Sequence, residues 1–205
     1  ALQRSQACLE MLRLLLHDRP KALNLLTRVQ RAQDDLQHLY EEVRSYSAPI
    51  VLQRQPCRLG DILQEAWAHL ADQRNGRNVQ LRDGCSGSNA DCEVDRILMA
   101  RVFENILENA LAACPDPVEI AVTCDETHWH RQRAFRLTIH DNGPGLNGEQ
   151  QQKIFEPFYT TKTRGTGLGM AIARRIVEAH EGRIEAANEP AGGAVIIITL
   201  PRGKP

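Results

Sequence analysis

The chain has 205 residues, 42% of them hydrophobic and 25% charged, and its 25 basic and 26 acidic residues give a formal net charge of −1. This length can bury a core without disulfides or metals, and the balanced charge gives no field that would draw the chain to nucleic acid or to an anionic membrane. Six scattered cysteines without a CxxC pair also argue against a zinc knuckle or a thioredoxin-like motif.

Two helices are predicted at the N-terminus. Leucines recur at helical spacing in residues 2–16, a turn-like cluster follows, and Pro20 suits the first turn of a second helix. That helix carries an apolar seam with heptad-like spacing, formed by Val29, Leu36, Leu39, Val43 and Tyr46. Since a hairpin of two amphipathic helices cannot bury both apolar faces alone, we expect residues 1–50 to dimerise as a four-helix bundle.

A second domain is expected over residues 55–205. Pro49 follows the end of the second helix, and the stretch through Pro56 is typical of a linker. Asp61 is a candidate N-cap for a helix that runs to about Arg74, and residues 79–82 alternate like a strand. Residues 83–91 are rich in Gly, Ser, Asn and Asp, which indicates a loop.

The remaining elements predict a mixed sheet. Asp95 is a candidate N-cap for a helix over 96–113, which the Cys114-Pro115-Asp116-Pro117 stretch stops. Strands are predicted at 118–123, 135–140, 183–187 and 194–200, and a helix at 168–180. This order indicates an α+β chain whose second domain is an α/β sandwich, with helices on one face of the sheet. The longest apolar run starts at Ala194 and is too short to cross a bilayer, so no membrane segment is expected here.

Four short blocks follow one another in this second domain. They are Asn105-Ile-Leu-Glu-Asn109-Ala110, Asp141-Asn142-Gly143-Pro144-Gly145, Phe155-Glu156-Pro157-Phe158-Tyr159 and Gly165-Thr166-Gly167-Leu168-Gly169. Each block alone is weak evidence, because two asparagines on a helix are often simply exposed and Asp-Asn-Gly is a common turn. The order and spacing of all four are hard to obtain by chance.

Together these blocks resemble the N, G1, F and G2 boxes of the sensor histidine kinases of two-component systems, over roughly residues 55 to 201. The Thr160-Thr161-Lys162 stretch and residues 110–113 resemble the nitrogen-regulator branch. The resemblance implies the histidine kinase/Hsp90-like ATPase fold, with ATP and Mg²⁺ as ligands. It further implies transfer of the γ-phosphate to a histidine and then to an aspartate of a response-regulator receiver domain. A homodimer in the cytoplasm is expected, with any membrane anchor outside this chain.

The first two blocks supply the expected metal and adenine ligands. Asn105 and Asn109 are four residues apart on one helix, so their side chains share a face. By resemblance Asn109 is the Mg²⁺ ligand and a catalytic residue, and Asn105 lines the same site; Mg²⁺ prefers oxygen ligands such as an amide carbonyl. A carboxylate at Asp141 can accept a hydrogen bond from the amine of adenine, and Gly143 and Gly145 let the backbone approach the base.

The last two blocks are expected to frame a lid over the nucleotide, from Asn147 to Thr166 and anchored by apolar packing of Phe155 and Phe158. Lys162 is a candidate phosphate contact and catalytic residue. Backbone N–H groups of the glycine-rich block, together with the N-terminus of the following helix, can cradle phosphates. The expected nucleotide-binding residues of this segment are Thr161, Lys162, Gly165, Thr166, Gly167, Leu168 and Gly169.

Asn105 bears on the type of reaction. ATP-hydrolysing relatives of the gyrase and Hsp90 types place a water-activating glutamate at this position, four residues before the asparagine. An amide cannot accept a proton from water as a general base does, so the sequence favours phosphate transfer over hydrolysis. A serine kinase of the same fold and a regulatory module that binds nucleotide without catalysis remain as alternatives.

The acceptor histidine is the missing part of the pattern. His17-Asp18-Arg19-Pro20 is a candidate, but the resemblance places a proline farther along and the acceptor nearly a full hairpin arm before Tyr46. We therefore expect His17 to lie in the hairpin turn and the acceptor to precede Ala1. Such a chain would bind ATP and dimerise but would not phosphorylate itself.

Overall fold

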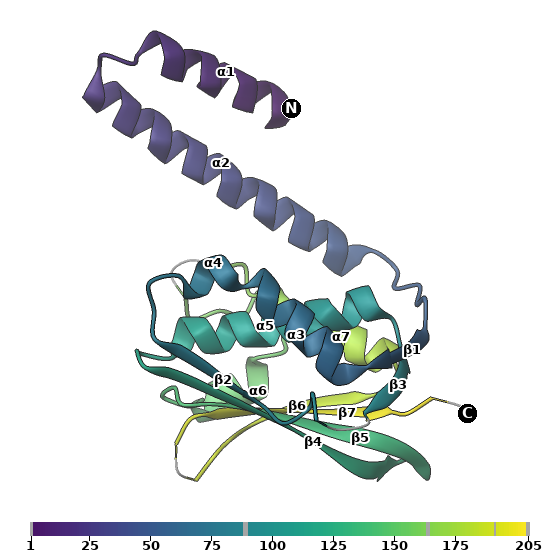
Figure 1. The fold of residues 1–205 in the computed structure, drawn as a ribbon. Coiled ribbons are helices and arrows are strands. Elements are labelled where there is room, and N and C mark those ends of the chain that lie inside the picture. The colour runs from purple at the N-terminus through teal and green to yellow at the C-terminus, as the bar shows by residue number, and fades with distance from the viewer. Residues whose placement is uncertain (1, 88–89, 163–164, 191, 204–205) are drawn as a thin grey trace. The chain divides into compact units, whose positions relative to one another are not determined.

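The structure is a computed structural model that describes residues 2–87, 90–162, 165–190 and 192–203. The chain divides into two compact units, Ala1–Ala48 and Pro49–Pro205. The first unit is a hairpin of helices α1 (Leu2–Leu15) and α2 (Pro20–Ser47), with Pro20 in the first turn of α2 as predicted (Figure 1). In the described part of the chain, no helix has the length and apolar character that a membrane span requires.

The hairpin leaves many large apolar side chains exposed. Val29, Leu36 and Val43, spaced seven residues apart on α2, are 52%, 60% and 39% exposed. Other exposed apolar side chains of the two helices are Met11, Leu12, Leu14, Leu15, Leu25 and Tyr40. Burying such side chains is the main favourable term in folding and association, so this surface is suited to a covering partner.

The second unit is built on a mixed sheet in the order β2–β4–β5–β7–β6. Strand β2 (Val79–Asp83) is parallel to β4 (Val118–Trp129), and the other neighbours are antiparallel: β4 with β5 (Gln132–Asp141), β5 with β7 (Ala194–Pro201), and β7 with β6 (Arg183–Asn188). Helices α3 (Leu59–His69), α5 (Arg96–Ala113) and α7 (Gly169–Ala179) cover one face of the sheet (Figure 1). The predicted α/β sandwich is confirmed.

The core lies between these helices and the sheet. Phe103 and Leu107 of α5 are fully buried, as are Leu137 of β5 and Ile198 of β7. Helix α5 begins as predicted, because the Asp95 side chain accepts a hydrogen bond from the Leu98 N–H at 3.1 Å. Helix α5 is thus capped at its start and packed against the core along its length. This packing fixes the positions of Asn105 and Asn109 on the helix.

A small second sheet was not predicted. Strand β1 (Gln55–Arg58) pairs antiparallel with β3 (Asp91–Val94), although the sequence assigned Pro56 to a linker and Asp91 to a loop. Strand β1 buries only Cys57, and β3 alternates with Cys92 and Val94 buried, but four residues are too short a run to distinguish a strand from a loop by periodicity.

The first helix of this unit also begins and ends differently from the prediction. Helix α3 starts at Leu59, so Asp61 is in its first turn and is not the N-cap. The next residue, Gly60, passes close to the Ser86 backbone, and an ideal Cβ on it would lie 2.7 Å from Ser86 Cα. The helix ends at His69, and a separate turn, α4 (Ala71–Arg74), completes the predicted span.

Strands β4 and β5 extend well beyond the predicted 118–123 and 135–140. Their ladder continues to the pair Trp129 and Gln132, so the polar connection predicted between them is mostly strand. His130 and Arg131 make the turn with φ values of 49° and 66°. Most side chains in this part of the two strands are polar and at least partly exposed, a pattern that is also typical of a loop.

Candidate functional site

Helix α5 and the segment after β5 bring the first two sequence blocks to neighbouring places in the second unit. The end of α5 and the end of β5 meet where the Cys114 thiol lies 3.6 Å from Asp141 Oδ1. The glycine-rich block also reaches α5, where Gly169 packs against Asn105. All three candidate regions therefore touch the same helix or its C-terminal turn.

Asn109 is in contact with the lid. Its Oδ1 accepts a hydrogen bond from the Lys162 ammonium at 2.6 Å, across 53 residues of sequence. Desolvation lowers the pKa of Lys162, and the nearby Glu108 carboxylate opposes this shift. Glu108 itself accepts a hydrogen bond from Gln73 at 2.7 Å. The amide that the sequence assigns to the metal and the lysine that it assigns to phosphate are thus brought together.

Asn105 lies one turn earlier on α5 and faces the start of α7. A Cβ on Gly169 would lie 3.0 Å from Asn105 Oδ1, so the glycine allows α7 to begin against this side chain. Asn105 Nδ2 is buried and has no hydrogen-bond partner among the described residues. A buried amide N–H without a partner is costly, and it is a donor available to a ligand.

Asp141 is 9% exposed and is held through one of its two oxygens. Its Oδ1 accepts hydrogen bonds from Gly143 N at 2.9 Å and Ala194 N at 3.3 Å, and contacts the Cys114 thiol. Burial and the adjacent Asp141 charge raise the pKa of Cys114 to about 12, which keeps the thiol protonated as a donor. Within the described chain no hydrogen bond is formed by Oδ2, so this oxygen can accept one from a ligand.

Glycines surround this aspartate for steric reasons. A Cβ on Gly143 would lie 2.8 Å from Asp141 Oδ1, and Gly145 adopts a φ of 77° beside the Asn188 side chain. Asn188 in turn accepts a hydrogen bond from Leu146 N at 2.7 Å and donates one to Leu146 O at 2.7 Å. The turn after β5 is therefore closely fixed, and side chains at these glycines would disturb it.

The lid segment contains helix α6 (Gly148–Lys153), which Asn147 and Gln150 start with a capping box. Phe155 is half-buried, but Phe158 is 61% exposed, so the predicted apolar anchoring by Phe158 is wrong. Phe158 has a φ of 67°, and its N–H donates to Gly167 O at 3.1 Å. The backbone of this residue, and not its ring, fastens the lid.

The glycine-rich block completes the other side of the lid. Gly167 has a φ of 70°, and its ideal Cβ would lie 2.6 Å from the backbone of Phe158 and Tyr159. Thr166 Oγ1 accepts a hydrogen bond from Leu168 N at 3.2 Å, and Leu168 is fully buried. Gly165 has a φ of 143° and is exposed, as is Thr161; residues 163 and 164 of the lid lie outside the described part of the chain.

Helix α7 begins at Gly169, the last residue of this block, and its N-cap Leu168 makes no side-chain capping hydrogen bond. The first N–H groups of a helix have no intrahelical acceptors and carry partial positive charge. The predicted helix N-terminus beside the glycines is therefore present. No cluster of three or more His, Cys, Asp or Glu side chains that could bind a metal occurs among the described residues.

Sequence reasoning missed two residues near Asp141. The sequence predicts Cys114 only as part of a helix stop and predicts no role for Arg77, yet Arg77 donates to the end of α5 and the Cys114 thiol contacts Asp141. The position of Cys114 just before a proline signals a helix end but says nothing of what its thiol touches. The contacts of Arg77 span 34 to 39 residues, and no local pattern marks them.

Comparisons with known proteins define the class. Residues 94–204 match the family described as "Histidine kinase-, DNA gyrase B-, and HSP90-like ATPase". The chain belongs to this ATPase family. Within the family its curated relatives are sensor kinases, and the ATPase domain of this chain is of the histidine kinase type.

A curated relative is the signal transduction histidine-protein kinase AtoS of Escherichia coli strain K12, which is 31% identical over 86% of this chain and 28% of its own length. The chain spans less than half the length of the first curated relatives that it matches. Among solved structures, the catalytic domain of histidine kinase ThkA is 28% identical, with a TM-score of 0.63 over 73% of this chain and 96% of that one.

A second solved structure extends the likeness of fold. Histidine kinase ThkA in complex with the response regulator protein TrrA aligns with a TM-score of 0.72 over 98% of this chain and 59% of that chain. The identity is 23%, so this comparison concerns the fold alone.

Proposed function

We propose that this chain is the catalytic core of a two-component sensor histidine kinase, which binds ATP with Mg²⁺ and transfers the γ-phosphate to a histidine. The observation that carries the proposal is the contact between Asn109 and Lys162 at 2.6 Å. It joins the helix that bears the candidate metal ligand to the lid that bears the candidate phosphate contact. Membership of the ATPase family supports the same conclusion.

The purine end of the site is assigned to Asp141. Its Oδ1 is held by two backbone N–H groups and contacts the Cys114 thiol, while Oδ2 is available to accept a hydrogen bond from the amine of adenine. Gly143 and Gly145 leave room for the base beside this carboxylate. An oxo group in place of the amine would meet an acceptor with an acceptor, so Asp141 favours adenine over hypoxanthine.

The phosphate end is assigned to α5, the lid and the start of α7. Asn109 Oδ1 fits a Mg²⁺ ligand, because this amide oxygen already accepts from a cationic group. Mg²⁺, when bound, neutralises phosphate charge during transfer. We assign a phosphate contact to Lys162 and to its neighbour Thr161. The backbone of this glycine-rich block and the first turn of α7 are proposed to supply further N–H donors, apart from the Leu168 N–H, which donates to Thr166 Oγ1.

Asn105 favours transfer over hydrolysis. Its amide cannot take a proton from water, and its buried Nδ2 is a donor without a partner in the described chain, suited to orienting a phosphate oxygen. Phosphoryl transfer depends mainly on positioning and charge stabilisation, which these residues can supply.

The hairpin is assigned to dimerisation. The seven-residue spacing of exposed Val29, Leu36 and Val43 on α2 supports pairing with a second copy as a four-helix bundle. By analogy with the ThkA complex, the partner that receives the phosphate is the receiver domain of a response regulator.

His17 is not assigned as the acceptor. It lies in the turn between α1 and α2, where its ring Nδ1 lies 3.1 Å from Leu14 O. The sequence resemblance puts the acceptor on a helix arm instead. His17 is therefore not proposed as the phosphorylated histidine.

Radioactive transfer tests the proposal. The protein with its natural upstream segment is incubated with γ-labelled ATP and Mg²⁺, and label on the protein that is acid-labile and alkali-stable is expected. Phosphate on His17 would contradict the acceptor assignment. Free phosphate without labelled protein would indicate an ATPase, and intact ATP despite binding would indicate a regulatory module; either result overturns the kinase proposal.

A further inference from the structure

We propose that Arg77 is a positioning residue for the purine end of the site, because it fixes the C-terminal turn of α5 against the strand end that carries Asp141. The inference rests on the proposed role of Asp141 in binding the base. Arg77 itself touches neither the candidate metal ligand nor the lid among its described contacts.

Arg77 caps the end of α5 from another part of the chain. Its Nη1 donates to Leu111 O at 2.5 Å and its Nη2 to Cys114 O at 2.9 Å. The last carbonyl groups of a helix lack intrahelical donors and carry partial negative charge, and α5 has no basic residue in its own last turn. Arg77 provides both the missing donors and the missing cation.

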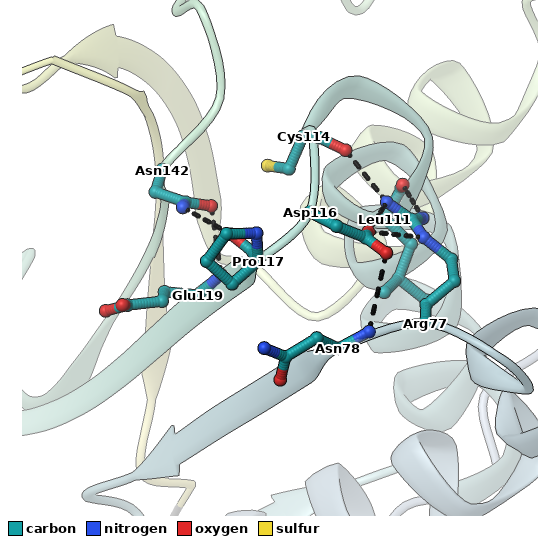
Figure 2. Close-up of polar contacts among 8 residues, drawn as sticks. All are labelled: Arg77, Asn78, Leu111, Cys114, Asp116, Pro117, Glu119 and Asn142. Carbon is teal, nitrogen blue, oxygen red and sulfur yellow. Dashed lines mark hydrogen bonds and ion pairs between the residues drawn. The ribbon is translucent and has the colours of Figure 1, made fainter.

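The same guanidinium holds the turn that follows the helix. Its Nε donates to Asp116 Oδ1 at 2.9 Å, and Asp116 Oδ2 accepts from Asn78 N at 3.4 Å (Figure 2). One side chain thus fixes the helix end and the next turn together, a task that requires the fork of donors of an arginine.

Two links lead from this turn to Asp141. The first is Cys114, whose carbonyl is held by Arg77 and whose thiol lies 3.6 Å from Asp141 Oδ1. The second is Asn142, whose Nδ2 donates to Pro117 O at 2.9 Å and whose Oδ1 accepts from Glu119 N at 2.9 Å. Figure 2 shows the 114–117 turn between Arg77 and Asn142.

This arrangement matters for base selection. A hydrogen bond weakens steeply when its distance or angle departs from the favoured range, so the benefit of Oδ2 to an adenine amine depends on where Asp141 is held. Loosening the 114–117 turn acts on this carboxylate through Cys114 and Asn142, the two links described above. Replacing Arg77 is therefore expected to reduce the preference for ATP over ITP, which carries an oxo group in place of the amine.

The test compares the affinities of the whole chain for ATP and ITP by calorimetry, in Mg²⁺ and at fixed salt. R77M is expected to reduce the preference for ATP by about 3- to 10-fold, in line with loss of a charge-assisted hydrogen-bond network, and to change ITP affinity less. R82M is the matched control, because Arg82 forms an exposed ion pair with Glu119 at 2.9 Å; its preference is expected to equal wild type.

A second pair of variants decides the matter if R77M fails to fold. C114S keeps a donor toward Asp141 and is expected to keep the preference, whereas C114A is expected to lower it. If D141N removes the preference but a folded R77M keeps it, the role of Arg77 is overturned and that of Asp141 stands. Where R77M does not fold, an intact preference in C114A overturns the proposed link from Arg77 through Cys114 to Asp141. If D141N also keeps the preference, the proposed purine site itself is wrong.

Discussion

The two ends of the candidate site differ in how firmly the protein holds their side chains. At the purine end, Asp141 Oδ1 has two backbone donors and a thiol contact, and the neighbouring Asn142 is bound through both atoms of its amide. At the phosphate end, Lys162 Nζ makes one hydrogen bond and Asn105 Nδ2 makes none among the described residues. The proposed base site is therefore held in place by the protein itself, while the proposed phosphate site has fewer contacts that a ligand would have to replace.

Replacing Gly167 should have the largest effect, because it would break the lid at its backbone support. The variant G167A places a Cβ about where the Phe158 and Tyr159 backbone stands and requires a φ of 70° that alanine disfavours. We expect ATP affinity to fall by about 10-fold or more, consistent with a strain of roughly 1–3 kcal/mol. Calorimetry measures the affinity, and hydrogen exchange of residues 155–162 reports the lid.

G148A is the control for this change, since nothing lies within 4 Å of a Cβ at Gly148 in the same segment. Its affinity and lid exchange should match wild type. Wild-type affinity in G167A would mean that the lid backbone contributes nothing to binding, and the contrast between the two ends would lose its basis.

A smaller effect is expected from Lys162, through the pH dependence of ATP affinity at the phosphate end of the site. Since desolvation lowers its pKa, the ammonium is lost at a lower pH than for an ordinary lysine, and ATP affinity should decline as pH rises through that pKa. In K162R the guanidinium stays charged, so this alkaline decline should disappear. Titrations of affinity against pH compare the two.

The neighbouring Lys153 supplies a control for Lys162. It pairs with Glu149 at 3.1 Å within α6, so K153R should leave the alkaline decline unchanged. An alkaline decline that persists in K162R would assign the titration to another group.

The smallest effect is expected from His180, through the pH dependence of stability. His180 supports the start of α5, the helix that both ends of the site contact. Its Nε2 accepts from the N–H of Asp95, the N-cap of α5, at 2.9 Å, and Nδ1 donates to Ile176 O at 2.8 Å. Burial lowers its pKa below the ordinary 6.5, with nearby Arg54 acting in the same direction and Asp95 against it. The unfolded chain therefore takes up the proton first, and stability is lost as pH falls below about 6.5.

Urea unfolding between pH 5 and 7.5 tests this point. Wild type should lose up to about 1.4 kcal/mol per pH unit below 6.5 through His180, and H180Q, which keeps an acceptor without titrating, should lose less. Equal slopes in the two proteins would show that His180 does not couple proton uptake to unfolding.

The sequence predicted the elements that carry strong local signals. Helix α5 has helical periodicity and an aspartate N-cap, and both were placed correctly. Strands β1 and β3 escaped prediction because four residues show no reliable period. Phe158 has a positive φ and an exposed ring, and a large apolar residue in the sequence predicts neither. The roles expected for the site residues remain proposals.

The supports around the site were beyond sequence reasoning for another reason. Arg77 reaches α5 across more than 30 residues, and the Cys114 thiol meets Asp141 only because β5 ends beside the helix. Motifs mark residues that touch a ligand, whereas the residues that hold them depend on which elements become neighbours in space.

The burial of the thiols has a practical consequence for labelling. Burial raises the pKa of Cys57, Cys92 and Cys114, and a hydrogen bond with Cys124 is the main cause for Cys85. Because the thiolate is the reactive form, a maleimide at neutral pH should modify the exposed Cys8 on α1 first. A fluorophore attached to Cys8 would test the proposed dimerisation of the hairpin by energy transfer between two labelled chains, and it would leave the nucleotide domain unlabelled.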